Sequence, residues 1–241
     1  TVKQIIRQVV KCVSCGTEGS EHPNCHMQKA AVPAPPLPHS ISTPSLVAQI
    51  MYQKFALGLP LARQENDWHR LGLVLPRGNM ARWIIRCSQE WLEPVYWAIH
   101  ARLMECAILH MAETRIQCNK EDGKKASSQS FMWVIRSAAD EEVRAAFFYY
   151  SRTRNGDVAK DLLKRFSGYL VTDAYSGYEK VENITRSLCW SHVRRKFLDS
   201  IPLDGKGKAI PGSKGAEAVG YIDLLFRVEA QIKDLRIEER K

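Results

Sequence analysis

The sequence has no long apolar run. No segment approaches the roughly 18 consecutive apolar residues of a membrane-spanning helix, and the first residues, TVKQIIRQVVKC, lack the apolar stretch of a signal peptide. We therefore expect no membrane partner and a cytoplasmic protein.

Cysteine is present in an odd number and at irregular spacings. Seven cysteines in a chain of 241 residues do not fit the framework of a small secreted disulfide protein. Cys12 and Cys15 form a C-x2-C pair, which is half of a tetrahedral Zn²⁺ site, and Cys25 with His22 or His26 could complete it locally. The remaining cysteines lie in apolar surroundings and are expected to be small core side chains: Cys87, Cys106, Cys118 and Cys189.

Acidic residues are outnumbered by basic ones. The chain has 35 Lys and Arg against 26 Asp and Glu, a formal charge of +9. This excess suits a polyanionic partner such as double-stranded DNA. With 45% hydrophobic residues, the chain can bury the core of one large or two small domains.

The amino-terminal part lacks hydrophobic periodicity at first and then becomes helical. Residues 1–41 are polar and rich in proline, which indicates a partial zinc-knuckle segment and a linker, AAVPAPPLP. Residues 42–106 carry helix signals. Ser42 or Thr43 can cap a first helix that has Pro44 in its first turn and ends at Gly58.

Two more helices are expected in the same region. The second covers residues 61–71, and the third begins near Arg77 and is kinked or restarted at Pro94. The spacing predicts one apolar face on the third helix, formed by Trp83, Ile84, Cys87 and Trp91. A helix, a turn containing glycine and another helix resemble a helix-turn-helix, a DNA-binding arrangement.

From residue 107 the pattern is that of strands. Residues 107–118, 130–136 and 145–150 are expected to be three consecutive strands, followed by a helix capped by Asp157. Strands over 169–173 and 184–190 and a further helix complete an α/β layer arrangement. The order is that of a ribonuclease-H-like mixed sheet domain over residues 107–200. Residues 201–241 are expected to be the loop and amphipathic helix of an insertion.

Five segments in this order resemble the insertion-sequence-sixty-six family of bacterial DDE transposases. They are LPLARQENDWHRLG, ILHMAETRIQ, SFMWVIR, FSGYLVTDAYSGY and CWSHVRRKF. The resemblance implies DNA cleavage and strand transfer at mobile-element ends by two Mg²⁺ or Mn²⁺ ions. It also implies double-stranded DNA of the terminal repeats as partner, a homo-oligomer on DNA and association with the nucleoid.

By this resemblance Asp173 matches the second catalytic acid and is a Mg²⁺ ligand. The alternative role of Asp173 is purely structural: its side chain caps the turn that follows it. At the first acid the family pattern is His-Ala-Asp-Glu-Thr, whereas this chain has Ala112 followed by Glu113. Glu113 is the candidate substitute. Because neighbouring strand residues point to opposite faces, we expect Glu113 to face away from the site that residue 112 lines.

The third acid of the family lies in an Asn-Asn-x-x-Glu motif, which this chain lacks. Glu217 and Glu229 are expected on a solvated helix face. The third acid of the family is therefore expected to lie beyond Lys241. The resemblance therefore implies a transposase whose catalytic core is incomplete and impaired in this copy. The alternatives are a non-catalytic DNA-binding remnant that regulates transposition and, with less support, a ribonuclease-H-like nuclease unrelated to transposition.

Two basic sets are candidates for contacts with DNA phosphates. The first belongs to the third helix and consists of Arg77, Asn79, Arg82 and Arg86. The second follows the fifth strand and consists of His192, Arg194, Arg195 and Lys196. Solvated helix faces are the alternative for both sets. Trp133, Trp190 and Tyr169 are expected in the core.

Overall fold

The computed structural model describes most of the chain from residue 34 onward and short pieces before it. The described residues are 6, 8–11, 27–31, 34–205, 208, 210–233, 235 and 239. The predicted zinc ligands Cys12 and Cys15, and their possible partners between residues 22 and 26, lie outside this set. The chain divides into two compact units, Thr1–Val95 and Tyr96–Lys241, rather than between residues 106 and 107.

The first unit contains an antiparallel strand pair and three packed helices. The strands are β1 (Val9–Lys11) and β2 (Met27–Lys29), and the helices are α1 (Pro44–Phe55), α2 (Leu61–Arg70) and α3 (Arg77–Cys87). The expected cap of α1 is confirmed, because the Thr43 hydroxyl accepts a hydrogen bond from the Leu46 backbone N–H at 3.2 Å.

The core of this unit joins the three helices. Ile50 and Met80 are fully buried among the apolar side chains of the helices. Gln64 of α2 is also fully buried, and its side-chain amide donates to the carbonyls of Ile50 and Leu59. Two backbone acceptors near the end of α1 are thereby paired, which holds α2 against it.

Beyond α3 the helix continues through a π-helical turn, η1 (Ser88–Leu92), into α4 (Glu93–Leu103). The α4 segment thus begins one residue before Pro94, and Pro94 lies in its first turn. Trp83, Ile84 and Cys87 are buried, whereas Trp91 is 59% exposed, so the predicted apolar face is buried only as far as Cys87. Cys87 and Trp91 border the same surface hollow.

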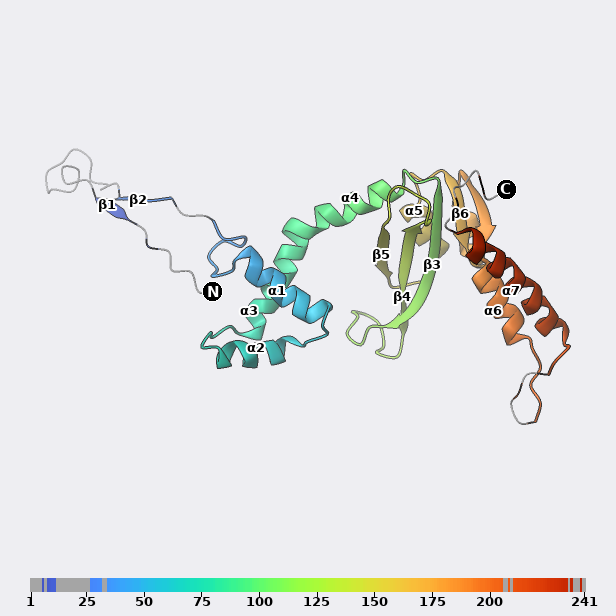
Figure 1. The fold of residues 1–241 in the computed structure, drawn as a ribbon. Helices are drawn as coiled ribbons and strands as arrows, with labels where there is room; N and C mark the ends of the chain where they lie inside the picture. The colour runs from blue at the N-terminus through green and yellow to red at the C-terminus, as the bar shows by residue number, and fades with distance from the viewer. Residues whose placement is uncertain are drawn as a thin grey trace. The chain divides into compact units, whose positions relative to one another are not determined.

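The second unit is built on a five-stranded mixed sheet (Figure 1). Its strand order is β5 (Ala146–Ser151), β4 (Gln129–Ser137), β3 (Ile108–Gln117), β6 (Gly168–Thr172) and β7 (Ile184–Leu188). The β3 strand is antiparallel to β4 and parallel to β6, and β6 is parallel to β7. The predicted α/β class with a mixed sheet is confirmed.

Helices and a short 3-10 turn complete this unit. They are α5 (Gly156–Leu162), the 3-10 turn η2 (Ser176–Lys180), α6 (Trp190–Asp199) and α7 (Lys214–Ile232). The last two helices lie side by side (Figure 1). The cap of α5 is Asn155 and not the predicted Asp157, because the side-chain oxygen of Asn155 accepts from the Asp157 N–H at 3.2 Å.

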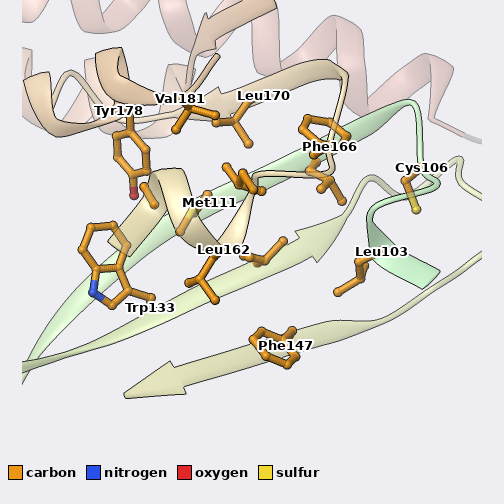
Figure 2. Close-up of a cluster of buried hydrophobic side chains, with 14 residues drawn as sticks. Leu103, Cys106, Met111, Trp133, Phe147, Leu162, Phe166, Leu170, Tyr178 and Val181 are labelled. Atoms are coloured by element: carbon orange, nitrogen blue, oxygen red, sulfur yellow. The ribbon is translucent and has the colours of Figure 1, made fainter. Parts of the chain in front are cut away.

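Alternation along the strands places one face of the sheet in a single apolar core (Figure 2). Met111, Trp133 and Leu170 all belong to it, and Trp133 and Leu170 are fully buried. Tyr169 is 56% exposed because it points to the other face from Leu170. Trp190 is 53% exposed because it begins α6 and does not end a strand. The core prediction is thus confirmed for Trp133 and wrong for the other two.

The four cysteines that were expected in the core differ in their burial. Cys87 and Cys106 are buried core side chains, as expected, whereas Cys118 and Cys189 are only partly buried. Among the described residues, no helix combines the length and apolar character required to span a bilayer.

Candidate functional site

The site is built around Asp173, which directly follows β6. Because β3 and β6 are parallel neighbours, with Ile108 paired to Tyr169 and His110 to Val171, their carboxyl ends point to the same edge of the sheet. Continuing this register sets Ala112 level with Asp173. The sheet thus brings the two positions of interest onto neighbouring strands.

At this edge of the sheet, the cavity lies on the face from which Glu113 projects and not on the face of Ala112. Glu113 is paired with Trp133, which is buried in the core, so both side chains emerge from the core face of the sheet. Ala112 points to the opposite face, as strand alternation requires. The expected alternation of Ala112 and Glu113 is therefore present, but the cavity lies on the side of Glu113, which lines it together with Asp173, and Ala112 does not line it.

Both carboxylate oxygens of Glu113 are engaged. Oε1 accepts from Nε of Arg154 at 2.6 Å and lies 2.5 Å from a terminal guanidinium nitrogen. Oε2 accepts from the hydroxyl of Tyr178 at 2.5 Å. The Glu113 side chain is only 3% exposed, so these partners replace nearly all of its contact with water.

Arg154 joins the two acids. The same terminal nitrogen that contacts Glu113 lies 3.6 Å from Oδ2 of Asp173. Its guanidinium carbon lies 4.1 Å from the centre of the Tyr175 ring, a cation–π arrangement, and the Tyr175 hydroxyl donates to the backbone carbonyl of Arg154. Burial lowers the pKa of Arg154, but the hydrogen bond and charge of Glu113 and the charge of Asp173 outweigh it, so the pKa is raised.

Asp173 also organises the loop that follows it. Its Oδ1 accepts from the backbone N–H of Tyr175 at 3.0 Å, so the turn-capping role considered for this residue is real. Arg186 of β7 holds the same loop, because it donates to the backbone carbonyls of Asp173 and Tyr175 and to the Thr172 hydroxyl. Oδ2 of Asp173 remains directed toward Arg154.

These groups border a cavity of about 480 Å³. On the other side of the cavity, α6 supplies His192, Arg195 and Lys196, three of the predicted DNA-contact residues. Nδ1 of His192 is buried and has no hydrogen-bond partner among the described residues. The remaining lining residues are Thr172, Ala174, Tyr175, Leu188, Cys189, Val193 and Asp199.

The described residues do not fit a pair of divalent metal ions as they are arranged. Ala112 has no side-chain oxygen, and both oxygens of Glu113 already accept from Arg154 and Tyr178. Arg154 also stands between Glu113 and Asp173. Within the described part of the chain, no three His, Cys, Asp or Glu residues are grouped so as to hold a metal ion.

The fourth predicted residue of α6, Arg194, has a different partner. Its guanidinium forms an ion pair with Asp223 of α7, with Nε 2.6 Å from Oδ1. It therefore ties α6 to α7 and does not line the cavity. Glu217, in the first turn of α7, and Glu229, in its last turns, are absent from the lining as well.

The basic set of α3 lies in the first unit. Asn79, Arg82 and Arg86 border a separate hollow of about 470 Å³ together with residues 37–41. Arg82 donates to Asn79 at 2.5 Å, and Arg86 pairs with Glu90 one turn later. Arg77 is exposed at the start of the helix and donates its backbone N–H to Glu65.

Sequence reasoning missed four residues that shape the cavity: Arg154, Tyr175, Tyr178 and Arg186. The tyrosines lie in the segment that follows Asp173, so their proximity was visible in the sequence as a tyrosine- and glycine-rich turn. Arg154 follows β5, and Arg186 lies on β7. No local pattern links either arginine to Asp173.

Comparison with known proteins identifies the family. The family model described as "Transposase IS66 family" matches residues 39–241. The protein y4jD of Sinorhizobium fredii (strain NBRC 101917 / NGR234) is 28% identical, across 100% of this chain and 46% of that protein. The protein y4hP of the same organism is 31% identical, across 84% of this chain and 39% of that protein. The chain thus spans less than half the length of these relatives.

A solved structure, the Drosophila P element transposase strand transfer complex, has a TM-score of 0.40 and 14% identity, covering 84% of this chain and 55% of that chain. This likeness is too low to establish a shared fold. The family match extends over most of the chain, including every residue of the cavity. The chain belongs to the IS66 family of transposases.

Proposed function

We propose that this chain is the part of a transposase that handles DNA at the ends of a mobile element, and that cleavage and strand transfer are impaired in this copy. The observation that carries the proposal is the position of Asp173, which follows β6 beside β3 and faces a cavity bordered by basic residues of α6. The family supplies the DDE type of chemistry.

The arrangement of the sheet supports a ribonuclease-H-like catalytic domain. In such a domain the first and fourth strands lie side by side, so that acids from both meet at one edge. Here β3 and β6, the first and fourth strands of the second unit, are parallel neighbours in the order β5-β4-β3-β6-β7. The position of Asp173 directly after β6 supports its assignment as the second acid.

Impairment follows from the oxygen ligands that are available. A Mg²⁺ site is built from carboxylates, substrate phosphates and waters, and each ion uses one or two protein carboxylates. Asp173 has one oxygen committed to the Tyr175 N–H, and Glu113 has both committed. Ala112 stands where the family has its first aspartate.

DNA binding depends on the basic residues and does not require the acids. Arg195 and Lys196 are exposed residues of α6 at the cavity, and His192 lies one turn earlier. Such residues neutralise backbone phosphates and release counterions, so binding weakens as salt rises. The helix-turn-helix-like pair α2 and α3 offers Arg77 and Arg82 as further phosphate contacts.

A non-catalytic regulator that occupies element ends is the second candidate function. It is favoured by one observation, the guanidinium of Arg154 between the two carboxylates of the site. Both functions require DNA binding, and they differ in whether any strand is cut.

The deciding experiment incubates the purified chain with a duplex that carries the element end. We expect binding that weakens more than about tenfold between roughly 50 and 200 mM salt, and no nicking with Mg²⁺ or Mn²⁺. Nicking by the chain that disappears in Asp173→Ala would show that this copy is active. Absence of binding at low salt would contradict both candidate functions.

A further inference from the structure

We infer that Arg154 is the resident cation of the Glu113–Asp173 pair, and that a divalent cation binds these carboxylates only when the guanidinium is removed. The inference rests on the ion pairs of Arg154 inside the chain, and it deepens the proposed impairment, because a pair closed to divalent ions does not support cleavage that needs Asp173 as a metal ligand. It explains how one cation pairs with two carboxylates that line the same cavity.

The first argument is geometric exclusion. A Mg²⁺ ion bound to a carboxylate lies about 2.0–2.1 Å from the oxygen, and a larger ion such as Mn²⁺ lies slightly further from it. The guanidinium nitrogen of Arg154 already lies 2.5 Å from Oε1 of Glu113 and 3.6 Å from Oδ2 of Asp173. An ion shared by these two oxygens would occupy the space of that nitrogen, and its charge would repel the guanidinium.

The second argument is that Arg154 is held in place from several sides. Glu113 engages both Nε and a terminal nitrogen, and the Tyr175 ring covers the guanidinium. The Tyr175 hydroxyl anchors the backbone of Arg154 as well. A side chain with these contacts loses more than one interaction when it swings away, so an ion must compete with the whole set.

The third argument is charge. Glu113 is 3% exposed and Asp173 is 27% exposed, so both carboxylates are partly or wholly withdrawn from water. With Arg154 present, two negative charges share one positive charge. Without it, a buried carboxylate beside a second carboxylate is left unpaired, a state that favours binding a cation from solution.

The test measures Mn²⁺ binding to the whole chain by isothermal titration calorimetry and by the electron paramagnetic resonance signal of free Mn²⁺. Arg154→Gln removes the guanidinium and keeps a polar side chain. We expect it to bind Mn²⁺ at least about tenfold more tightly than the wild type, and the gain to vanish in the double variant Arg154→Gln with Asp173→Asn. The melting temperature of Arg154→Gln should rise with Mn²⁺, whereas that of the wild type should not.

The matched control is Arg144→Gln. Arg144 is an exposed arginine just before β5, at the opposite end of the sheet from the cavity, and its removal changes the net charge by the same amount. It should leave Mn²⁺ affinity at the wild-type value. Arg154→Lys keeps the charge but cannot span both acids with a planar fork, so it should show a smaller gain than Arg154→Gln.

Two results would overturn the inference. One is a folded Arg154→Gln or Arg154→Lys protein that binds Mn²⁺ no more tightly than the wild type. The other needs no arginine variant: if Asp173→Asn alone lowers the Mn²⁺ affinity of the chain, the pair already binds the ion with Arg154 present. If the wild type and Asp173→Asn bind equally, the pair is closed to the ion, as we infer.

Discussion

The hydroxyl of Tyr178 donates a hydrogen bond to Oε2 of Glu113 at 2.5 Å, which connects the turn after β6 to the strand beside it. Burial, followed by the hydrogen bond to Glu113 and its negative charge, raises the pKa of Tyr178, so the hydroxyl remains a donor across the ordinary pH range. Tyr178 is fully buried and lies in the same apolar cluster as Trp133 (Figure 2).

Tyr178→Phe removes this donor and leaves a buried carboxylate oxygen with one partner fewer. We expect a loss of about 1–3 kcal/mol in the free energy of unfolding, measured by urea denaturation. The control is Tyr169→Phe, at a tyrosine that is 56% exposed, which should change the value by less than about 0.5 kcal/mol. Equal effects of the two changes would mean that the hydrogen bond to Glu113 contributes nothing.

The approach of α5 to η2 depends on the missing side chain of Gly156. A Cβ atom there would lie 2.7 Å from the Cα of Gly177 and closer still to its carbonyl oxygen, both backbone atoms. Gly156→Ala should therefore force the two segments apart and cost about 1–3 kcal/mol of stability.

Gly220→Ala is the matched control for this change. Gly220 lies inside α7, and a Cβ atom there would meet nothing within 4 Å. Alanine in a helix interior is favoured over glycine, so this variant should be up to about 1 kcal/mol more stable. Thermal unfolding of both variants checks the prediction, which fails if Gly156→Ala is as stable as the wild type.

The loop between β3 and β4 contains a carboxylate whose pKa depends on folding. Hydrogen bonds from Ser130 and Tyr150, opposed by burial and supported by Lys124, lower the pKa of Glu121 from 4.5 to about 2. A lowered folded-state pKa stabilises the fold above the ordinary value of 4.5, and this stability is lost as the pH falls through about 2.

Glu121→Gln should accordingly lower stability near neutral pH and flatten the decline between these two pH values. The measurement is the melting temperature of wild type and variant from about pH 6 to about pH 2. Glu182→Gln is the comparison, because the Glu182 side chain is 71% exposed and its pKa is lowered mainly by one hydrogen bond, from Lys160. An unchanged pH profile in Glu121→Gln would contradict the assignment.

The basic residues of α6 should differ in how much each contributes to DNA binding. Replacing Arg195 and Lys196 together by alanine should weaken binding and reduce the slope of log affinity against log salt by about two, one for each phosphate that the variant no longer neutralises. Fluorescence anisotropy with a labelled duplex at several salt concentrations gives both quantities.

Arg194→Ala serves as the internal comparison, since it removes the same charge from the same helix. Because Arg194 pairs with Asp223, we expect this variant to lose stability while its salt slope stays close to the wild-type value. If Arg194→Ala lowers the slope as much as a single change at Arg195 does, Arg194 contacts DNA and its ion pair with α7 opens on binding.

Local patterns determined the elements of this protein. The cap at Thr43 with Pro44 predicted the start of α1, and runs of β-branched and aromatic residues predicted the strands of the second unit. These signals are local because they depend on backbone hydrogen bonds and on side-chain periods of 2 and 3.6 residues. The five segments, one of which contains Asp173, were likewise sufficient to predict the family, which the match over residues 39–241 confirms.

The tertiary structure decided which side of the sheet forms the site. Alternation showed that Ala112 and Glu113 point to opposite faces, but not that the cavity would lie on the side of Glu113. Arg154 reaches Glu113 across 41 positions of sequence, and Arg186 reaches Asp173 across 13. Such contacts depend on how strands pair and how loops close over them, which no local period encodes, so the cation between the two acids emerges only in the folded chain.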